Sequence, residues 1–302
     1  RVLDILPVPY SQLGFLIRNK NIPCNVAMIQ VSPPNSRGEY SLGLGVEYLA
    51  AALGAARAVI AEVNDQVPWT HTEPLLREED FDLAIETSRP PVRLKTPPPG
   101  EREKQIARHA AAFIPDGATL ETGIGALPNA VLAALRDRKG LRFHSGAIPD
   151  GATELDLASC TGGALMGTPR LFAWARDNPL VRLVSSDRTH GGAALARIER
   201  FVALNSAVEA DYTGQVNGES ASGSYVGAVG GALDFIRAAN QSRGGVPIIV
   251  LPAARSVECL TGPVSVPRSE AGIFVTELGA ADLRGCGLRE REKRMRAISG
   301  NS

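Results

Sequence analysis

The segment ATLETGIGALPNAVLAAL, residues 118–135, is the strongest local signal in the chain. A short strand-like run leads into Gly123-Ile124-Gly125, and Pro128 then takes a first-turn position of an apolar-periodic helix. Glycines let a backbone pass close to a ligand, and the free amides at a helix start attract anions or a developing oxyanion. A tight turn from strand to helix without a ligand uses the same motif, so G-x-G alone leaves ligand binding open.

Short β-branched runs alternate with helical patterns along the rest of the chain. Such alternation is typical of βαβ units and predicts a largely parallel sheet covered by helices, so the expected fold class is α/β. Strands are expected at 25–31, 57–63, 117–122, 141–144, 181–185, 200–205, 246–252 and 272–277. Apolar residues at near-helical spacing predict helices over 101–114 and 128–138.

A proline-rich segment, SRPPVRLKTPPPGER (88–102), interrupts this alternation. Because proline fixes its own φ and keeps the preceding residue out of the α region, we expect an extended connector. We place a domain boundary there, with part of an N-terminal domain in 1–95 and a C-terminal domain in 96–302. The first part is short for an α/β domain, and the chain opens on Arg1 rather than Met, so we expect the first domain to be incomplete in this sequence.

Composition narrows the class of protein. The 302 residues are 44% apolar and 21% charged, which predicts a globular protein with a full core. Thirty-two basic residues balance thirty-two acidic ones, so we expect neither nucleic acid nor an anionic membrane as a partner. No apolar run is as long as a membrane span. Four cysteines without C-x-x-C spacing predict isolated thiols, no metal site and a cytoplasmic location: Cys24, Cys160, Cys259 and Cys286.

A second glycine cluster lies in GSYVGAVGGALDFIRAANQSRGG (223–245). Gly227, Gly230 and Gly231 precede an amphipathic segment through Phe235 and Ile236. These glycines could serve only to let a helix approach a sheet closely. Two such clusters in one predicted domain favour convergence on a shared ligand.

The motifs of this chain closely resemble the acetyl-CoA hydrolase/transferase family, which includes 4-hydroxybutyrate and acetate CoA-transferases. The segments that carry the resemblance are VSPPNSRGEYSLG (31–43), AEVNDQVPWT (61–70), LETGIGALPNAVL (120–132), ALMGTPRLFAWARDNP (164–179), LNSAVEADYTGQVNGES (204–220), VGGALDFIRAA (229–239) and FVTELGAADLRG (274–285). They come in the family's order and span almost the whole chain. The resemblance implies two α/β domains of the CoA-transferase (NagB/RpiA-like) type, with acyl-CoA bound between them.

The resemblance also implies roles for particular residues. The family's first glycine turn binds coenzyme A, which corresponds here to Gly123, Ile124, Gly125, Ala126 and Leu127. The second cluster lines the same site in the family, which corresponds here to Gly230 and Gly231. Coenzyme A and its acyl thioester are therefore the expected substrate, with a small acceptor or water as the second partner and no metal.

The family's nucleophile is absent at its expected position. Relatives carry a glutamate in a His-Ser/Thr-Glu stretch, and this glutamate attacks the thioester to form a glutamyl-CoA intermediate. Counting from Gly123 places that position on Gly146, in GLRFHSGAIPDG (140–151), without insertion or deletion. Because glycine has no side chain, transfer through a covalent intermediate at this position is excluded.

Other groups near Gly146 are weaker candidates for catalysis. His144 and Ser145 are adjacent on an expected strand, so they point to opposite faces and cannot form a dyad. His144 could act alone as a general base, or it could simply be packed and hydrogen-bonded at the strand end. Glu121 lies two residues before the glycine turn and is either a catalytic candidate or a residue of the other sheet face. His190 is expected in a solvated loop.

Three functions remain open from the sequence. The first is an enzyme that acts on an acyl-CoA thioester by direct transfer or hydrolysis, without a glutamyl-CoA intermediate, with backbone amides near Gly125 holding the oxyanion. The second is a non-catalytic CoA-binding or scaffold subunit. The third is an ordinary acetate/4-hydroxybutyrate-type CoA-transferase with an engineered Glu-to-Gly change at 146. The family's habit makes a homodimer or higher homo-oligomer the expected assembly.

Overall fold

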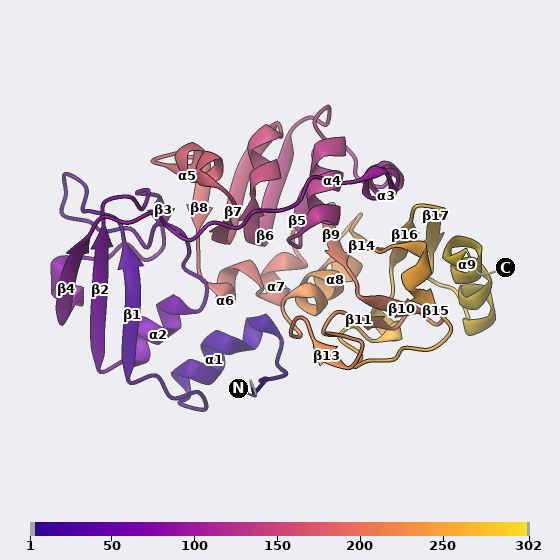
Figure 1. Ribbon diagram of the computed structural model, residues 1–302, viewed down its shortest axis with the longest axis horizontal. Coiled ribbons are helices and arrows are strands. Elements are labelled where there is room, and N and C mark those ends of the chain that lie inside the picture. Colours follow the sequence, from indigo (N-terminus) through magenta and orange to yellow (C-terminus); the bar gives the residue numbers. More distant parts are fainter. Residues whose placement is uncertain (1–3, 301–302) are drawn as a thin grey trace.

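The computed structural model describes residues 4–300 of the chain, and Figure 1 shows them as an elongated molecule. The α-helices are α1 (Leu13–Arg18), α2 (Leu49–Ala55), α3 (Glu101–Ala111), α4 (Ala126–Ala134), α5 (Pro169–Ala175), α6 (Ser186–Thr189), α7 (Gly192–Leu195), α8 (Ala232–Gln241) and α9 (Leu288–Ser299). Short 3-10 helices are η1 (Tyr10–Gln12), η2 (Glu78–Asp80), η3 (Asp150–Glu154), η4 (Ala253–Arg255) and η5 (Arg268–Glu270).

The strands divide among four sheets. In chain order they are β1 (Val26–Val31), β2 (Ala58–Asn64), β3 (His71–Thr72), β4 (Leu83–Thr87), β5 (Thr119–Thr122), β6 (Leu141–Pro149), β7 (Leu157–Met166), β8 (Val181–Leu183), β9 (Phe201–Ser206), β10 (Glu209–Asp211), β11 (Val216–Asn217), β12 (Ser220–Ala221), β13 (Ser224–Tyr225), β14 (Val246–Val250), β15 (Ser256–Val257), β16 (Ile273–Thr276) and β17 (Gly279–Asp282). Among the described residues, the largest sheet has nine strands.

The nine-stranded sheet confirms the predicted α/β class with a largely parallel sheet. Its strand order is β17-β16-β14-β9-β5-β6-β7-β8-β3, and every neighbouring pair is parallel except β16 with β17. A smaller parallel sheet, β1-β2-β4, belongs to the first part of the chain. The remaining sheets, β11-β10-β15 and β12-β13, have three and two strands.

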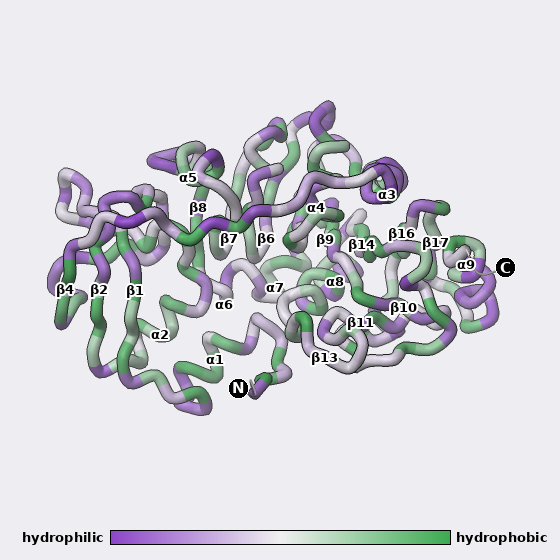
Figure 2. Tube along the Cα trace, viewed as in Figure 1, coloured by the Kyte–Doolittle hydropathy of each residue, from purple (hydrophilic) through white to green (hydrophobic). Residues whose placement is uncertain are grey.

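The large sheet has a separate hydrophobic core on each face. Along β9, Val202 and Leu204 belong to one cluster of buried side chains, whereas Phe201 and Ala203 belong to another. The first cluster includes side chains of α3 and α4, and the second includes side chains of α8 and α9. Alternation with a period of two explains this division, because successive side chains of a strand point to opposite faces. Figure 2 shows hydrophobic residues along the strands and hydrophilic residues on α3.

The order of the strands reverses direction beside β5. From β5 the chain adds β6, β7 and β8 on one side, and it then returns to place β9, β14 and β16 on the other side. In an open parallel sheet, the carboxyl ends of the strands at such a reversal leave a crevice, because the connections on the two sides diverge. The expected ligand site is therefore at the carboxyl ends of β5, β6 and β9.

Strand β6 is longer than the sequence indicated. We expected a strand over 141–144, but β6 continues to Pro149 because it pairs with β7 along its length, including Ser145 with Gly162 and Ala147 with Ala164. Its neighbour β5 already ends at Thr122. Gly146 therefore lies inside a strand whose other edge is uncovered beyond the end of β5.

The first part of the chain is attached to the large sheet. Its strand β3 pairs with β8, and residues 88–100 form the extended connector that crosses from β4 to α3 (Figure 1). Side chains of β1 and β2 share the cluster of buried residues that α3 and α4 also contribute to. The division at 95 and 96 stays a prediction.

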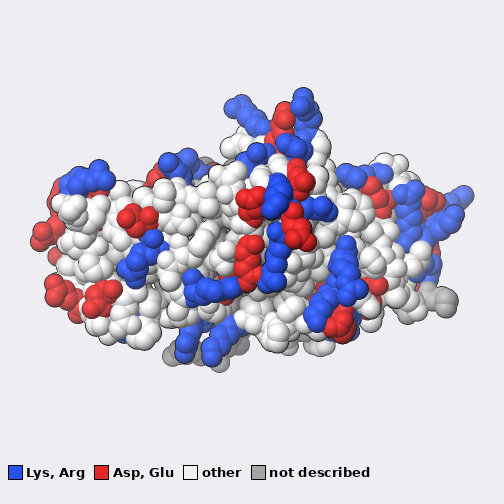
Figure 3. Space-filling model, turned by 90° about the horizontal axis from the view of Figure 1, so that it is seen from above, with Lys and Arg blue, Asp and Glu red and all other residues white. Residues whose placement is uncertain are grey.

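Charged residues of both signs are interspersed over the face shown in Figure 3, in keeping with the balanced composition. Most ion pairs lie at the surface, such as Arg18 with Asp187, which joins α1 to α6 through two hydrogen bonds of 2.7 and 2.9 Å. Within residues 4–300, the structure has no helix long and apolar enough to cross a membrane.

Candidate active site

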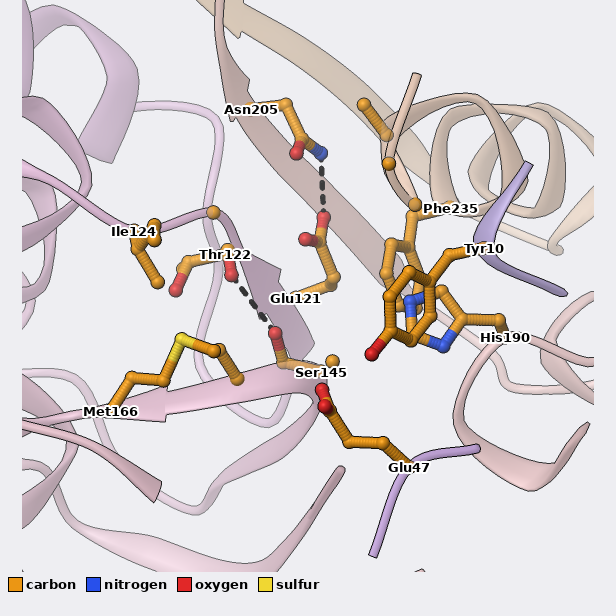
Figure 4. A pocket seen from close by; sticks show the side chains of 16 residues that line it. Tyr10, Glu47, Glu121, Thr122, Ile124, Ser145, Met166, His190, Asn205 and Phe235 are labelled. Atoms are coloured by element: carbon orange, nitrogen blue, oxygen red, sulfur yellow. Dashed lines mark hydrogen bonds between the residues drawn. The ribbon is translucent and has the colours of Figure 1, made fainter. Parts of the chain in front are cut away.

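A pocket of about 260 Å³ opens at the strand reversal. Its walls come from η1, the segment before α2, the ends of β5, β6 and β9, and the start of α8. The lining residues are Tyr10, Glu47, Glu121, Thr122, Gly123, Ile124, Ser145, Gly146, Ala147, Met166, His190, Asn205, Gly230, Gly231, Ala232 and Phe235. Figure 4 shows their side chains around the pocket. The position of the pocket agrees with the crevice expected from the topology.

The structure brings the two predicted glycine clusters together. Gly123 and Ile124 line the pocket from the β5 turn, and Gly230 and Gly231 line it from the start of α8. Gly125 caps α4 with φ of +119°, a conformation that L side chains rarely adopt, so glycine is required there. The first amides of α4, from Ala126 and Leu127, have no intrahelical partner and remain available to an anion or oxyanion.

Gly146 lies in the wall of this pocket, and the ring of His190 occupies the space that a side chain on Gly146 would need. A Cβ added to Gly146 would lie 2.9 Å from Cε1 and 3.0 Å from Nε2 of His190. A Cβ on Gly231 would also meet this ring, 2.6 Å from its Cδ2. Distances below 3 Å are not tolerated between such atoms, so the imidazole fits only because both positions are glycine.

His190 is buried, and the expectation of a solvated loop residue is wrong. Only 3% of it is exposed, because the short helix α6 packs it under β6. Its ring lies between Tyr10 and Phe235, at centroid distances of 4.8 and 4.5 Å. Its Nδ1 lies 2.7 Å from the hydroxyl of Thr189. Burial lowers the pKa of His190 to about 3, so the imidazole is neutral near pH 7.

Glu121 points into the pocket rather than to the other face of the sheet (Figure 4). It is 2% exposed and has no ion-pair partner among the described residues. Its Oε2 accepts a hydrogen bond of 2.8 Å from Nδ2 of Asn205, at the end of β9. Burial raises the pKa of Glu121 well above its ordinary value, although this hydrogen bond opposes the shift. The site therefore favours the protonated acid, and a catalytic role stays a prediction.

His144 and Ser145 point to opposite faces, as predicted. Ser145 lines the pocket, but its hydroxyl donates to the carbonyl of Thr122 at 2.9 Å. His144 is not among the residues that line the pocket, and its Nε2 lies 3.1 Å from the carbonyl oxygen of Thr189. Burial lowers its pKa. This geometry is that of the packed, hydrogen-bonded histidine considered above. The contact between His144 and Thr189 links β6 to α6.

Tyr10 and Glu47 are pocket residues that the sequence did not indicate. The amide of Tyr10 donates to the carbonyl of Gly230 at 2.9 Å, which holds η1 against the second glycine cluster. Glu47 has a left-handed backbone with φ of +45°, a strained conformation for a residue with a side chain. The two side chains hydrogen-bond with each other, and burial raises the pKa of both. Neither residue stands in a motif, and both lie far from the glycine turn in sequence.

Two further carboxylates, Glu209 and Asp211, are not among the residues that line the pocket, and each is held by hydrogen bonds from a loop or turn. Glu209 accepts hydrogen bonds from the amide and hydroxyl of Thr261, at 3.2 and 2.9 Å. Asp211 accepts from the amides of Thr213 and Gln215, at 2.9 and 3.1 Å, and so stabilises a turn. Within residues 4–300, no three side chains of His, Cys, Asp or Glu are grouped so that they could hold a metal ion.

Comparison with solved structures defines the class of fold first. The structure superposes on a 4-hydroxybutyrate CoA-transferase from Porphyromonas gingivalis with a TM-score of 0.86 and 30% identity. The superposition covers 96% of this chain and 75% of that one. It also superposes on RipA from Yersinia pestis with a TM-score of 0.95 and 28% identity, over 100% of this chain and 73% of that one. The fold is therefore that of the CoA-transferases, as predicted.

Sequence comparison then identifies the family. Residues 2–87 match the acetyl-CoA hydrolase/transferase N-terminal domain, and residues 167–301 match the C-terminal domain. A 4-hydroxybutyrate coenzyme A transferase from Clostridium kluyveri is 36% identical over 312 residues, which span 96% of this chain and 73% of that protein. The chain belongs to the acetyl-CoA hydrolase/transferase family, and by class it is a transferase or hydrolase.

Proposed function

We propose that this protein binds an acyl-CoA thioester at the pocket and passes the acyl group directly to water or a small acceptor. No glutamyl-CoA intermediate forms, because position 146 has no side chain to attack the thioester. The observation that supports this proposal is that the His190 ring, within the pocket wall, occupies the space that a side chain on residue 146 would need.

The relatives support the substrate class. Several are named as CoA-transferases of 4-hydroxybutyrate, succinate and acetate, or butyrate, and others as acetyl-CoA hydrolases. In the proposed complex, the thioester carbonyl lies beside Gly123 and Ile124, with Gly230 and Gly231 on the opposite wall. The amides at the start of α4 would then stabilise the oxyanion that forms during attack.

Two buried carboxyl groups with raised pKa values give the pocket an unusual character for thioester chemistry. Burial favours the protonated forms of both Glu121 and Glu47. A carboxyl in its protonated form is a poor nucleophile, but it can donate a hydrogen bond to a carbonyl oxygen. This supports direct displacement rather than a second covalent route through another carboxylate.

The experiment is a turnover assay coupled to mass spectrometry. Purified protein is incubated with acetyl-, butyryl-, 4-hydroxybutyryl- and succinyl-CoA, and free thiol is followed with and without acetate, a small amine or an alcohol. We expect thiol release with no increase in protein mass. Binding of CoA without any turnover would support the alternative of a non-catalytic subunit, and a protein–CoA adduct would contradict the proposed mechanism.

The third alternative, an ordinary CoA-transferase with an engineered glycine, is disfavoured by the same contact. A single change at 146 would leave a cavity, but a buried and stacked histidine fills the space. We further propose a cytoplasmic, homo-oligomeric enzyme. Fractionation and light scattering after size-exclusion chromatography test these two points.

A further inference from the structure

We infer that His190 is the general base of this reaction, with Nε2 as the atom that takes the proton from the attacking acceptor. This inference rests on the proposed function, because it assigns a group to the step in which water or a small acceptor attacks the thioester. The ring stands against Gly146 in the pocket wall, so it replaces an attacking carboxylate by a proton acceptor.

The orientation of the ring is defined on every side. The rings of Tyr10 and Phe235 pack against it in tilted arrangements, at centroid distances of 4.8 and 4.5 Å. Thr189 binds Nδ1 at 2.7 Å, on the edge that points away from the two glycines. The opposite edge, with Nε2 and its neighbouring carbons, faces Gly146 and Gly231. Because these contacts fix the ring, the lone pair on its nitrogen points in one direction.

The proposal places the proton of the neutral ring on Nδ1 and the lone pair on Nε2. In this tautomer, Nδ1 donates to the Thr189 hydroxyl at 2.7 Å, and the hydroxyl donates to the carbonyl of Ser185 at 3.4 Å, one helical turn earlier. Nε2 has no hydrogen-bond partner among residues 4–300, so this lone pair is available to a molecule in the pocket.

The step is balanced with water as the acceptor. As the oxygen of water bonds to the thioester carbon, one of its protons moves to Nε2, and the carbonyl oxygen becomes an oxyanion. When the tetrahedral intermediate collapses, the carbon–sulfur bond breaks and the proton on Nε2 passes to the leaving sulfur. The products are a free carboxylic acid and CoA thiol, and His190 returns to its neutral form. An amine or alcohol acceptor follows the same sequence.

The burial of His190 affects both proton transfers of this cycle. The ring is neutral near pH 7, so its lone pair is present before the acceptor arrives. Burial disfavours the imidazolium, so it weakens the ring as an acceptor of the proton and strengthens it as a donor of that proton to the sulfur. The geometry of the ring in the pocket wall, and not its pKa, therefore carries the assignment.

The test compares His190→Ala with rescue by small aromatic rings. Imidazole and 1,2,4-triazole have the same shape, but triazole is a much weaker base. Because the His190→Ala cavity lies beside two glycines, each ring can enter it. We expect His190→Ala to lower kcat on the best acyl-CoA of the four probes about 100-fold to 10,000-fold. Added imidazole should raise the kcat of His190→Ala at least tenfold, and added triazole should not raise it.

Two controls separate catalysis from folding. His109→Ala changes a histidine on α3, whose Nδ1 binds the carbonyl of Thr276 at 3.0 Å, and it should keep the wild-type rate. His190→Asn retains a polar side chain of intermediate size, and it replaces His190→Ala in the assay if the latter does not give a native circular dichroism spectrum. CoA binding by calorimetry should be unchanged in all variants.

The outcomes distinguish this inference from the proposed function. If the wild type releases thiol but both His190 variants keep at least half of its rate, or if triazole rescues His190→Ala as well as imidazole does, His190 is not the base. If the wild type has no turnover with any probe, or forms a protein–CoA adduct, the proposed function fails and the inference fails with it.

Discussion

The imidazole of His190 lies where a side chain on residue 146 would begin, with its Cε1 2.9 Å from the place of a Cβ. One wall of the pocket is therefore built from two residues that depend on each other. Position 146 must be small for the ring to fit, and the ring must be present for the wall to be closed. Four predictions follow from this contact and from the buried groups around it.

Gly146→Glu should not create a working CoA-transferase by itself. The new side chain would displace His190, and such overpacking costs about 1–3 kcal/mol of unfolding free energy. The double variant Gly146→Glu/His190→Gly removes the obstacle, so the carboxylate can reach the thioester. We expect a covalent CoA adduct, detected by intact-protein mass spectrometry, only in the double variant. An adduct in the single variant would show that His190 moves aside freely. Gly192→Ala is the matched control, because nothing lies within 4 Å of its Cβ.

Gly231→Ala should lower both stability and turnover. Its backbone conformation suits alanine, with φ of −100°, so the effect comes from the contact of the new methyl group with His190. We expect a loss of about 1–3 kcal/mol in chemical denaturation. Gly54→Ala in α2 is the opposite case, since its Cβ would meet nothing within 4 Å and alanine favours a helix. The Gly54→Ala variant should gain about 0.5–1 kcal/mol of unfolding free energy. Equal effects of the two changes would contradict the packing described.

Glu121→Gln should change how stability depends on pH. The pKa of Glu121 is raised in the folded state, so the folded protein keeps a proton that the unfolded chain loses above pH 4.5. Wild-type stability therefore falls as pH rises above that value, by about 1.4 kcal/mol per pH unit until the folded pKa is reached. The glutamine variant lacks this loss, and it should be the more stable protein at pH 8 but not at pH 4. If wild type and Glu121→Gln differ in unfolding free energy by the same amount at pH 4 and at pH 8, this prediction is wrong.

His190 should make the protein sensitive to acid. Its folded pKa is about 3 against an ordinary value of 6.5, so between these values the unfolded chain binds a proton that the folded state excludes. The stability contributed is complete above pH 6.5 and is lost as pH falls toward 3. His190→Asn should lose less stability than the wild type between pH 7 and pH 5, measured by urea denaturation. An equal loss in both proteins would contradict the buried, neutral ring.

Several titratable groups on the packed elements must be considered in that comparison. Tyr10 of η1 packs against the ring, His144 of β6 acts on it electrostatically, and Asp234 belongs to α8. Asp187 and Arg188 are on α6 itself. All of them are present in both proteins, so the difference between wild type and His190→Asn isolates the contribution of the one ring.

A comparison of predicted and observed strands shows which parts of the fold depend only on the local sequence. Apolar patterns placed the strands that became β5, β9 and β14 within one or two residues at most positions, because a buried strand requires apolar residues wherever it is. The strand expected over 141–144 instead continues to Pro149. Pairing of Ser145 and Ala147 with β7 keeps this segment extended, and no local pattern contains that partner.

The candidate site divides in the same way. Gly123 and Gly230 were visible because a glycine cluster before a helix is a signal in the sequence itself. His190, Tyr10 and Glu47 were not, because each reaches the pocket from an element that is remote along the chain and packs there only in the folded state. His190 was expected in a solvated loop, whereas its burial under β6 depends on contacts from η1, β6 and α8.

The sequence by itself determined that position 146 cannot attack a thioester, because glycine lacks a side chain in every possible fold. It also determined the parallel α/β architecture, because alternating apolar runs can be buried in few other ways. Only the tertiary structure decided what stands in the empty place. An imidazole fills it because the reversal of strand order brings β5, β6 and β9 to one crevice, and α6 packs against that crevice from a distant part of the chain.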